Sequence, residues 1–238
     1  MMICRAVIEL FSLPVLRQNL AFRGGTALHK LFLKPATRYS EDIDLVQMKA
    51  GAIGPVMDGV HEALDPWLGT PRREQKQGNT VLTYRVSSEM APVVPLRLKI
   101  EINTREHFTA LGLVERTLTV DSRWFTGRSA IPTFPVDELL GTKMRALYQR
   151  RKGRDLFDLW LGLTHGGANA ATVVSVFHKY VAAEGNVILR AEFEQNLALK
   201  MKHAGFLSDL PPLLRPGVAY DATAAYGLVV RELLPLLG

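Results

Sequence analysis

The sequence has little cysteine and no long apolar run, and these two shortages limit what the protein can be. Cys4 is the single cysteine among 238 residues, so an internal disulfide and a thiolate metal cluster are excluded. A reducing compartment such as the cytoplasm is therefore expected. No window offers the roughly 18 uninterrupted apolar residues of a membrane span. Charges at Arg5, Glu9 and Arg17 interrupt the apolar N-terminus, which predicts an amphipathic helix and not a signal peptide.

Several catalytic signatures are missing as well. The phosphate-binding pattern G-x-x-x-x-G-K-[ST] is absent, and the six histidines show no metal spacing such as H-E-x-x-H. No nucleophile elbow supports Ser-His-Asp catalysis. Lys and Arg exceed Asp and Glu by 29 to 23, which gives a net charge of +6 and a pI near 9.5. This moderate excess allows a polyanionic partner such as a nucleic acid without requiring one.

Strand and helix patterns alternate in residues 1–135, whereas residues 136–238 read only as helices. Period-two alternation and short apolar runs predict about five strands, which are residues 20–22, 42–45, 81–87, 96–103 and 118–120. Helical patterns cover residues 27–33 and 50–68 of the first part. The segment Ile131–Pro135 marks the expected junction. We predict an α/β domain with a half-covered sheet, followed by a helical domain.

A glycine turn follows the first predicted strand. Gly24 and Gly25 lack a Cβ, so their backbone N–H groups can approach a phosphate closely. The Thr26 hydroxyl either caps the following helix or donates to a ligand oxygen. Glycine pairs mark tight turns in general, and a plain turn is the alternative interpretation.

Three carboxylates are the strongest chemical signal in the first part of the chain. Asp42 and Asp44 stand at i and i+2 of a strand, so both side chains point the same way, about 6–7 Å apart. Hard oxygen ligands at this spacing suit Mg²⁺, which completes its shell with water and substrate phosphates. Glu101 lies on the polar face of a strictly alternating strand and joins them if the two strands are neighbours. Two metal ions could then serve an in-line phosphoryl transfer. The alternative for Asp42 and Asp44 is an exposed strand edge with two acids. The alternative for Glu101 is an ordinary solvated face.

Charges also crowd one stretch of the helical part. Lys143 lies at the edge of an apolar helical stripe, and cations at 150, 151, 152 and 154 surround Gly153, which we expect to end that helix. Asp155 stands where an N-cap acid belongs, and Asp158 follows one turn later. Lys143 as a triphosphate ligand, with Asp158 as its partner or as a base, would explain the crowding. A capped helix start beside a cationic helix end is the simpler alternative.

These motifs together resemble the AbiEii nucleotidyltransferase toxins, which include the mycobacterial MenT toxins. The resemblance rests on Phe22-x-Gly-Gly-Thr-x-Leu28, Arg38-x-Ser-Glu-Asp-Ile-Asp-Leu45, the strand Lys99–Asn103, and Lys143-x-x-Ala-Leu147 with Arg154-Asp-Leu-x-Asp-Leu159. It covers Phe22 to Trp160. The stretch before the glycine turn is short for the family.

The resemblance implies an α+β fold, with a polymerase β-like nucleotidyltransferase domain and its mixed sheet followed by a C-terminal helical domain. It implies that Asp42, Asp44 and Glu101 hold Mg²⁺ or Mn²⁺. The NTP is then expected to contact the glycine turn, Arg38, Ser40 and Lys143. Asp155 and Asp158 complete the implied site. In some members, phosphorylation of a Ser or Thr two residues before the first metal aspartate silences the enzyme, and Ser40 occupies that position here.

The resemblance also implies a bacterial toxin that is encoded with a cognate antitoxin. Characterised members transfer NMP from an NTP to the tRNA 3′ end, which blocks aminoacylation and growth. We expect RNA, not DNA, as the acceptor. Two alternatives remain, because similar motifs occur in antibiotic nucleotidyltransferases. One is an enzyme of the same fold that modifies a small molecule or a protein, and the other is a catalytically silent RNA-binding module.

Overall fold

The computed structural model of the protein describes residues 1–76 and 78–238. The chain divides into two compact units. The first comprises Met1–Leu31, Glu41–Phe108 and Leu113–Phe134. The second comprises Pro135–Gly238 together with two short segments from earlier in the chain, Phe32–Ser40 and Thr109–Gly112. Across the described residues, no helix has the length and apolarity that a membrane crossing requires.

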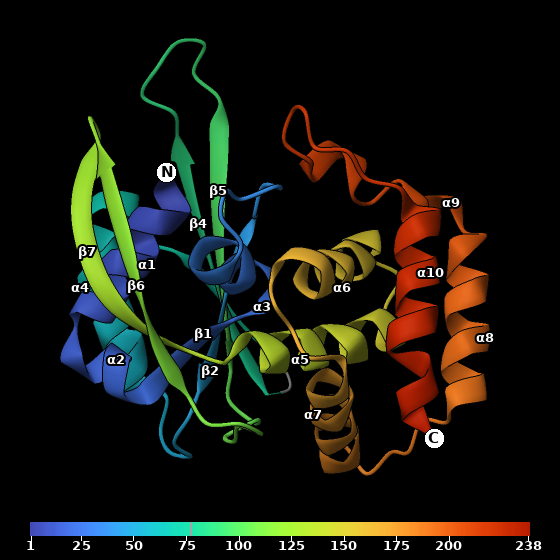
Figure 1. Cartoon of the computed structure of the whole chain (residues 1–238). Coiled ribbons are helices and arrows are strands. Elements are labelled where there is room, and N and C mark those ends of the chain that lie inside the picture. Colours follow the sequence, from blue (N-terminus) through green and yellow to red (C-terminus); the bar gives the residue numbers. More distant parts are fainter. Residues whose placement is uncertain (77) are drawn as a thin grey trace. The chain divides into compact units, whose positions relative to one another are not determined.

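The first unit is built on a mixed sheet whose seven strands all lie in the described residues (Figure 1). The order is β3-β4-β5-β2-β1-β7-β6. β2 and β5 pair in parallel, as do β1 and β7, and the other neighbours are antiparallel. The strands are β1 (Leu20–Arg23), β2 (Asp42–Gln47), β3 (Arg72–Lys76), β4 (Asn79–Ser87), β5 (Pro95–Asn103), β6 (Val114–Ser122) and β7 (Phe125–Thr133).

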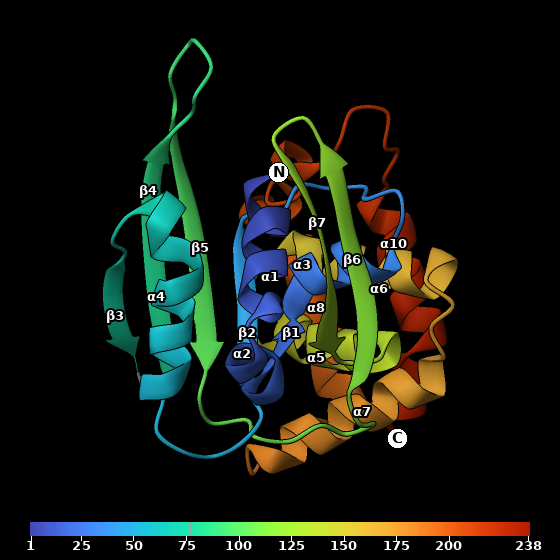
Figure 2. The ribbon, with the colours of Figure 1, turned by 90° about the vertical axis from the view of Figure 1, so that its left-hand side faces the viewer.

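Three helices cover one face of this sheet, as the views in Figures 1 and 2 show. They are α1 (Met2–Ser12), α2 (Pro14–Asn19) and α4 (Gly54–Leu68), and they contact strands β1, β2, β4, β6 and β7. The apolar residues of β2 and β5 are buried beneath them, including Ile43, Leu45, Leu98, Ile100 and Ile102. The alternate residues of the same strands point to the opposite face. A short helix, α3 (Gly24–Ala27), continues into the π-helical turn η1 (Leu28–Phe32).

The sequence-based prediction missed two strands, β3 and β7. It also made β6 too short, because it gave only residues 118–120. β3 has charged or polar residues throughout because it is an exposed edge strand, so it shows no apolar alternation. β7 contains Gly127 and Pro132, which are typical of loops, and its last residues fall in the segment that was interpreted as a domain junction. The prediction of about five strands is therefore wrong, whereas the α+β fold class, with a mixed sheet and a helical C-terminal part, is confirmed.

The second unit is helical. Its helices are α5 (Val136–Gln149), α6 (Gly153–His165), α7 (Ala170–Ala183), α8 (Arg190–Met201), α9 (Ala204–Leu207) and α10 (Ala222–Glu232), with 3₁₀ turns η2 (Pro211–Leu213) and η3 (Leu234–Leu237). α5 packs against α6, α7 and α8, and α10 packs against α6. Buried Glu138 of α5 accepts hydrogen bonds from Tyr180 and from residues 109–111, which explains why the segment Thr109–Gly112 belongs to this unit.

Candidate active site

The parallel pairing of β2 and β5 aligns the charged residues of both strands. Asp42 lies opposite Lys99, and Asp44 lies opposite Glu101. Because paired residues of neighbouring strands point to the same face, all four side chains lie on the face away from α1, α2 and α4. The expected neighbourhood of the Asp42–Asp44 strand and the Glu101 strand is confirmed.

Asp42 is held in an unfavourable electrostatic state. Its Oδ1 is buried and has no hydrogen-bond partner among the described residues. Burial raises the pKa of Asp42, and the charges of Asp44 and Glu41 raise it further, while Lys99 opposes them. Such a carboxylate would gain from a cation at its buried oxygen.

Lys99 supplies part of the missing positive charge. Its ammonium donates to Glu101 Oε2 at 2.7 Å. Burial tends to lower the pKa of Lys99, but the hydrogen bond from Lys99 to Glu101 and the charges of Glu101, Asp42 and Asp44 outweigh that effect and raise it. Lys99 is therefore charged, and it balances the acidic group on this face. The alternation pattern placed Lys99 beside Glu101, but only the strand pairing reveals that it lies opposite Asp42.

Glu101 lies on the expected face, but its two oxygens already have partners. Oε1 accepts from Asn79 Nδ2 at 2.8 Å, and Oε2 accepts from Lys99. Within residues 1–76 and 78–238, no group of three or more His, Cys, Asp or Glu side chains is arranged to hold a metal ion. Glu101 as a third metal ligand thus stays a prediction, one that requires Glu101 to turn away from Lys99.

The glycine turn packs directly against the second aspartate. Gly24 has φ +78°, which favours glycine, and a Cβ at this position would overlap Asp44 Oδ2. Thr26 donates its hydroxyl proton to the backbone oxygen of Asp42 at 2.6 Å. Neither expected role of the hydroxyl, helix cap or ligand contact, matches this bond, which instead ties the turn to the start of β2. Gly25 is buried in the same turn.

The second unit contains a buried network of opposite charges. The Lys143 ammonium lies 3.0 Å from Asp155 Oδ1 and 3.0 Å from Asp158 Oδ2. Arg38 donates to both oxygens of Asp158 at 2.8 Å, and Arg150 donates to both oxygens of Asp155 at 2.7 and 2.8 Å. Both aspartate side chains are fully buried. The structure thus brings together four of the expected site residues, Arg38, Lys143, Asp155 and Asp158.

The ion pairs fix the charge states of this network. Burial alone would raise the pKa of Asp155, but Lys143 and Arg150 lower it below the ordinary value. Burial likewise tends to lower the pKa of Arg38, and Asp158 more than compensates, so the net shift is upward. Breaking buried pairs of this kind is costly, because the remaining charge is left without compensation.

Several expectations about this region are corrected by the structure. Gly153 begins α6 and does not end α5, and Asp155 does not cap α6, whose N-cap is Lys152. Lys152 and Arg154 pair with Asp209 at 3.1 and 3.3 Å, so the crowd of cations reflects ion pairing within the unit. Asp209 and Arg150 were not among the expected site residues, and no spacing signal links Asp209 to them.

Ser40 belongs to the second unit, where it is half-buried. Its hydroxyl oxygen is buried and has no hydrogen-bond partner in the described part of the chain. The expected contact with the nucleotide and the regulation of Ser40 by phosphorylation stay predictions.

Comparison with protein families decides where this chain belongs. Residues 5–226 match the family model described as nucleotidyl transferase AbiEii toxin, type IV toxin–antitoxin system. The chain belongs to the AbiEii family. The predicted fold class and the resemblance to the AbiEii family are thereby confirmed. Membership of this family implies a toxin with nucleotidyltransferase activity and a cognate antitoxin.

Solved structures agree with the AbiEii assignment at the level of the fold. MenT4, a nucleotidyltransferase toxin from Mycobacterium tuberculosis, is 20% identical, with a TM-score of 0.67 over 99% of this chain and 82% of that one. JHP933 from Helicobacter pylori is 16% identical, with a TM-score of 0.59 over 99% of this chain and 89% of that one. No curated protein sequence matches the chain significantly.

Asp42 and Asp44 of this AbiEii chain fit a divalent cation. They offer hard oxygen donors, one of which is buried without a partner among the described residues, and Mg²⁺ and Mn²⁺ prefer such ligands. The glycine turn leaves no room for a side chain beside Asp44, so the backbone of the turn lies directly against this carboxylate. Water and substrate phosphates would supply the remaining ligands.

The raised pKa of Asp42 predicts a stability effect that is independent of activity. The folded state holds the Asp42 proton more tightly than the unfolded state, so ionisation costs stability above about pH 4 and costs nothing below it. Without divalent ions, Asp42→Asn should therefore raise the Tm at pH 7, by the equivalent of less than about 1 kcal/mol because solvent still screens the group. The gain should vanish at lower pH.

Thermal unfolding with and without Mn²⁺ checks this prediction. Mn²⁺ should raise the Tm of the parent but not that of the variant, because bound ligand stabilises the folded state. The matched control is Asp58→Asn, at an exposed position of α4, and this variant should behave like the parent. A lower Tm for Asp42→Asn at pH 7 would contradict the electrostatic description of Asp42.

The buried network predicts that Lys143 also stabilises the fold. Lys143→Ala removes the cation shared by Asp155 and Asp158, and it should cost about 3–5 kcal/mol of unfolding free energy. Lys152→Ala, which removes the half-exposed partner of Asp209, should cost about 0–1 kcal/mol. Urea denaturation followed by circular dichroism measures both. A loss below about 1 kcal/mol for Lys143→Ala would show that the network is not structural.

Proposed function

We propose that this AbiEii protein transfers NMP from an NTP to the 3′ end of tRNA, in a reaction that depends on Mg²⁺ or Mn²⁺. The observation that carries the proposal is the β2–β5 register, which sets Asp42 and Asp44 beside Lys99 and Glu101 on one face of the sheet. The family assignment supplies the reaction class, and the face supplies the groups that such a reaction needs.

The reaction joins the 3′-hydroxyl oxygen of the acceptor to the α-phosphorus of the NTP. The bond between the α-phosphorus and the oxygen that bridges to the β-phosphate breaks, pyrophosphate leaves, and the hydroxyl proton is lost to solvent. A divalent cation bound by Asp42 and Asp44 would polarise the phosphoryl oxygens and neutralise their charge. The amide groups of Gly24 and Gly25 would contact the triphosphate, because the turn lies directly against Asp44, a proposed ligand of the metal.

Lys143 is proposed as a further ligand of the triphosphate. Lys143 is 6% exposed, and its ammonium is now shared between Asp155 and Asp158. A phosphate oxygen would have to replace one of these aspartate oxygens. Arg38, Asp155 and Asp158 would then hold Lys143 in place, acting as positioning residues.

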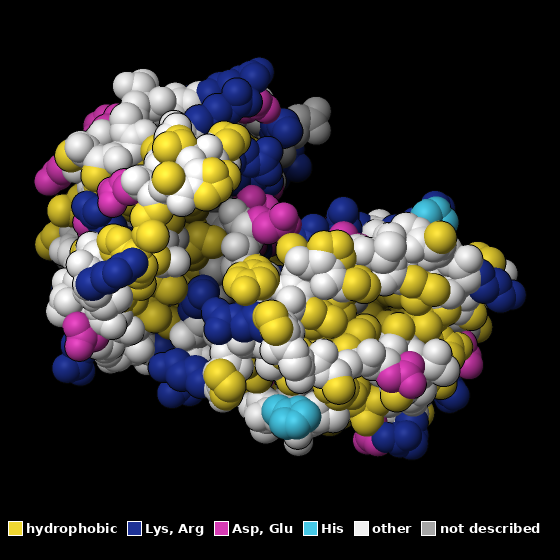
Figure 3. Space-filling model, turned by 90° about the horizontal axis from the view of Figure 1, so that it is seen from above, with side chains coloured by type: hydrophobic (Ala, Val, Ile, Leu, Met, Phe, Trp, Pro, Cys, Tyr) yellow, Lys and Arg dark blue, Asp and Glu magenta, His cyan; other side chains and the backbone are white. Residues whose placement is uncertain are grey.

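The acceptor is proposed to be RNA because of charge and family. The protein has a net charge of +6, and polyanions gain most of their affinity from contacts between cations and phosphates. On the face drawn in Figure 3, Lys and Arg side chains gather in several separate groups, with Asp and Glu side chains between them. The family is one of toxins that act within a toxin–antitoxin system, and blocking the tRNA 3′ end would stop growth.

Incubation with each labelled NTP and total tRNA, followed by gel electrophoresis, tests the proposal. The parent should label tRNA from one or more NTPs, and chelation of divalent ions should stop the reaction. Asp44→Ala should lower the rate at least about 100-fold, which is the size of effect expected for a group that organises charge in the transition state. Asp58→Ala is the matched control and should leave the rate unchanged.

Two results would contradict the proposal in different ways. An Asp44→Ala enzyme with near-normal turnover would remove the metal-binding role of that carboxylate. If the label appears in a small molecule or in a protein and not in tRNA, the protein is still a nucleotidyltransferase, but its acceptor is not tRNA.

A further inference from the structure

Two arginines face each other on neighbouring strands. Arg85 of β4 and Arg97 of β5 are directly opposite in the antiparallel register, and both are exposed. Neither side chain forms a hydrogen bond or ion pair with any described residue, although Arg97 is close enough to Asp42 to lower its pKa. Like charges in this arrangement destabilise a sheet. The pair therefore costs stability, which a bound anion would relieve.

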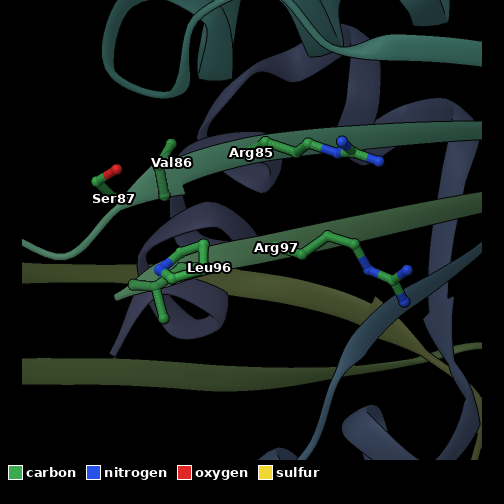
Figure 4. Close-up of a pocket in the computed structure, with 6 residues that line it drawn as sticks. Arg85, Val86, Ser87, Leu96 and Arg97 are labelled. Carbon is green, nitrogen blue, oxygen red and sulfur yellow. The ribbon is translucent and has the colours of Figure 1, made fainter. Parts of the chain in front are cut away.

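The arginine pair lies on the same face of the sheet as the carboxylates. Arg97 precedes Lys99 by two residues, and Lys99 is the register partner of Asp42. Figure 4 shows the side chains of Arg85 and Arg97 extending in the same direction from their two strands. Both line a cavity of about 390 Å³ together with Val86, Ser87, Pro95 and Leu96. The cavity is open to solvent and contains no acidic lining residue among those described.

The pair and the glycine turn flank the carboxylates on opposite sides. In the strand order β4-β5-β2-β1, the arginines occupy the first two strands, the aspartates occupy β2, and the glycine turn follows β1. If the triphosphate binds at the glycine turn, as proposed above, the arginines offer a second place for a phosphate on the other side of the carboxylates. A transfer reaction needs two such places, because the donor and the acceptor both carry phosphates.

We propose that Arg85 and Arg97 bind a backbone phosphate of the acceptor RNA, close to its 3′ end. This inference rests on the proposed function and specifies which surface holds its acceptor. Arg97 lies two residues before Lys99, the position opposite Asp42, which is a distance of about 7 Å along β5. The bound phosphate would therefore lie near the reacting end of the RNA. Guanidinium groups suit this task, because they bind phosphate oxygens in pairs.

Direct binding experiments test the pair separately from catalysis. Arg85→Gln and Arg97→Gln are each compared with the parent by fluorescence anisotropy, using a dye-labelled single-stranded RNA of about 12 nucleotides. Arg128→Gln is the matched control, since Arg128 is exposed on β7, three strands beyond β5 in the order of the sheet. Each test variant should bind the RNA about 5–10-fold more weakly, and the control should bind like the parent.

Two further readouts distinguish phosphate binding from a structural role. The slope of log affinity against log salt should shrink by about 0.7 for each lost phosphate contact. The Tm should stay the same or rise in both variants, because the repulsion between the arginines is relieved. The KM for the NTP should not change, whereas the KM for the acceptor should rise.

Three results would overturn the inference. The first is unchanged RNA binding in both variants, the second is no RNA binding by the parent even at low salt, and the third is a loss of NTP affinity with RNA affinity unchanged. The third would assign the pair to the donor triphosphate. The proposed function would fail in a different way. In that case the parent would bind RNA through the two arginines but would not transfer NMP to it.

Discussion

The candidate site depends on one electrostatic constraint, the presence of two like charges on one face of β2. Asp42 and Asp44 repel each other, and the alternation of the strand places both side chains on the same face. The surrounding structure relieves this only in part. Lys99 lies opposite Asp42, Thr26 fixes the backbone at Asp42, and the glycine turn closes against Asp44. One oxygen of Asp42 is still buried without a hydrogen bond among the described residues. A carboxylate that is balanced this incompletely is suited to binding a cation together with a charged substrate.

In the second unit, by contrast, the charges of the buried acids are fully compensated. Asp155 and Asp158 are both fully buried, yet each carboxylate has both oxygens bound by an arginine and is shared with Lys143. Every carboxylate of this network is paired with cations of the same unit. Removing Lys143 would take away one of these cations, and it should therefore destabilise the fold. The contrast matters for function, because charged residues with the same motif spacing can serve either structure or chemistry. Any catalytic use of Lys143 would have to exchange an aspartate for a phosphate.

Sequence patterns predicted the parts of the fold that follow local rules. Alternation identified β2 and β5, and the spacing of apolar residues identified the helices on either side of Gly153. The partners of each charge could not be read from the sequence, because Lys99 meets Asp42 only through strand pairing and Asp209 lies more than fifty residues from Lys152 and Arg154. Edge strand β3 and the Gly- and Pro-containing β7 were missed, since neither shows the usual pattern of a half-buried strand.

The most direct test of the account is a crystal structure of the protein soaked with Mn²⁺ and a non-hydrolysable NTP, with anomalous diffraction to locate the metal. The account predicts an anomalous peak coordinated by the carboxylates of Asp42 and Asp44, with triphosphate oxygens completing the shell and reaching the glycine turn. Mn²⁺ bound elsewhere while Asp42 and Asp44 contact only protein atoms would contradict it.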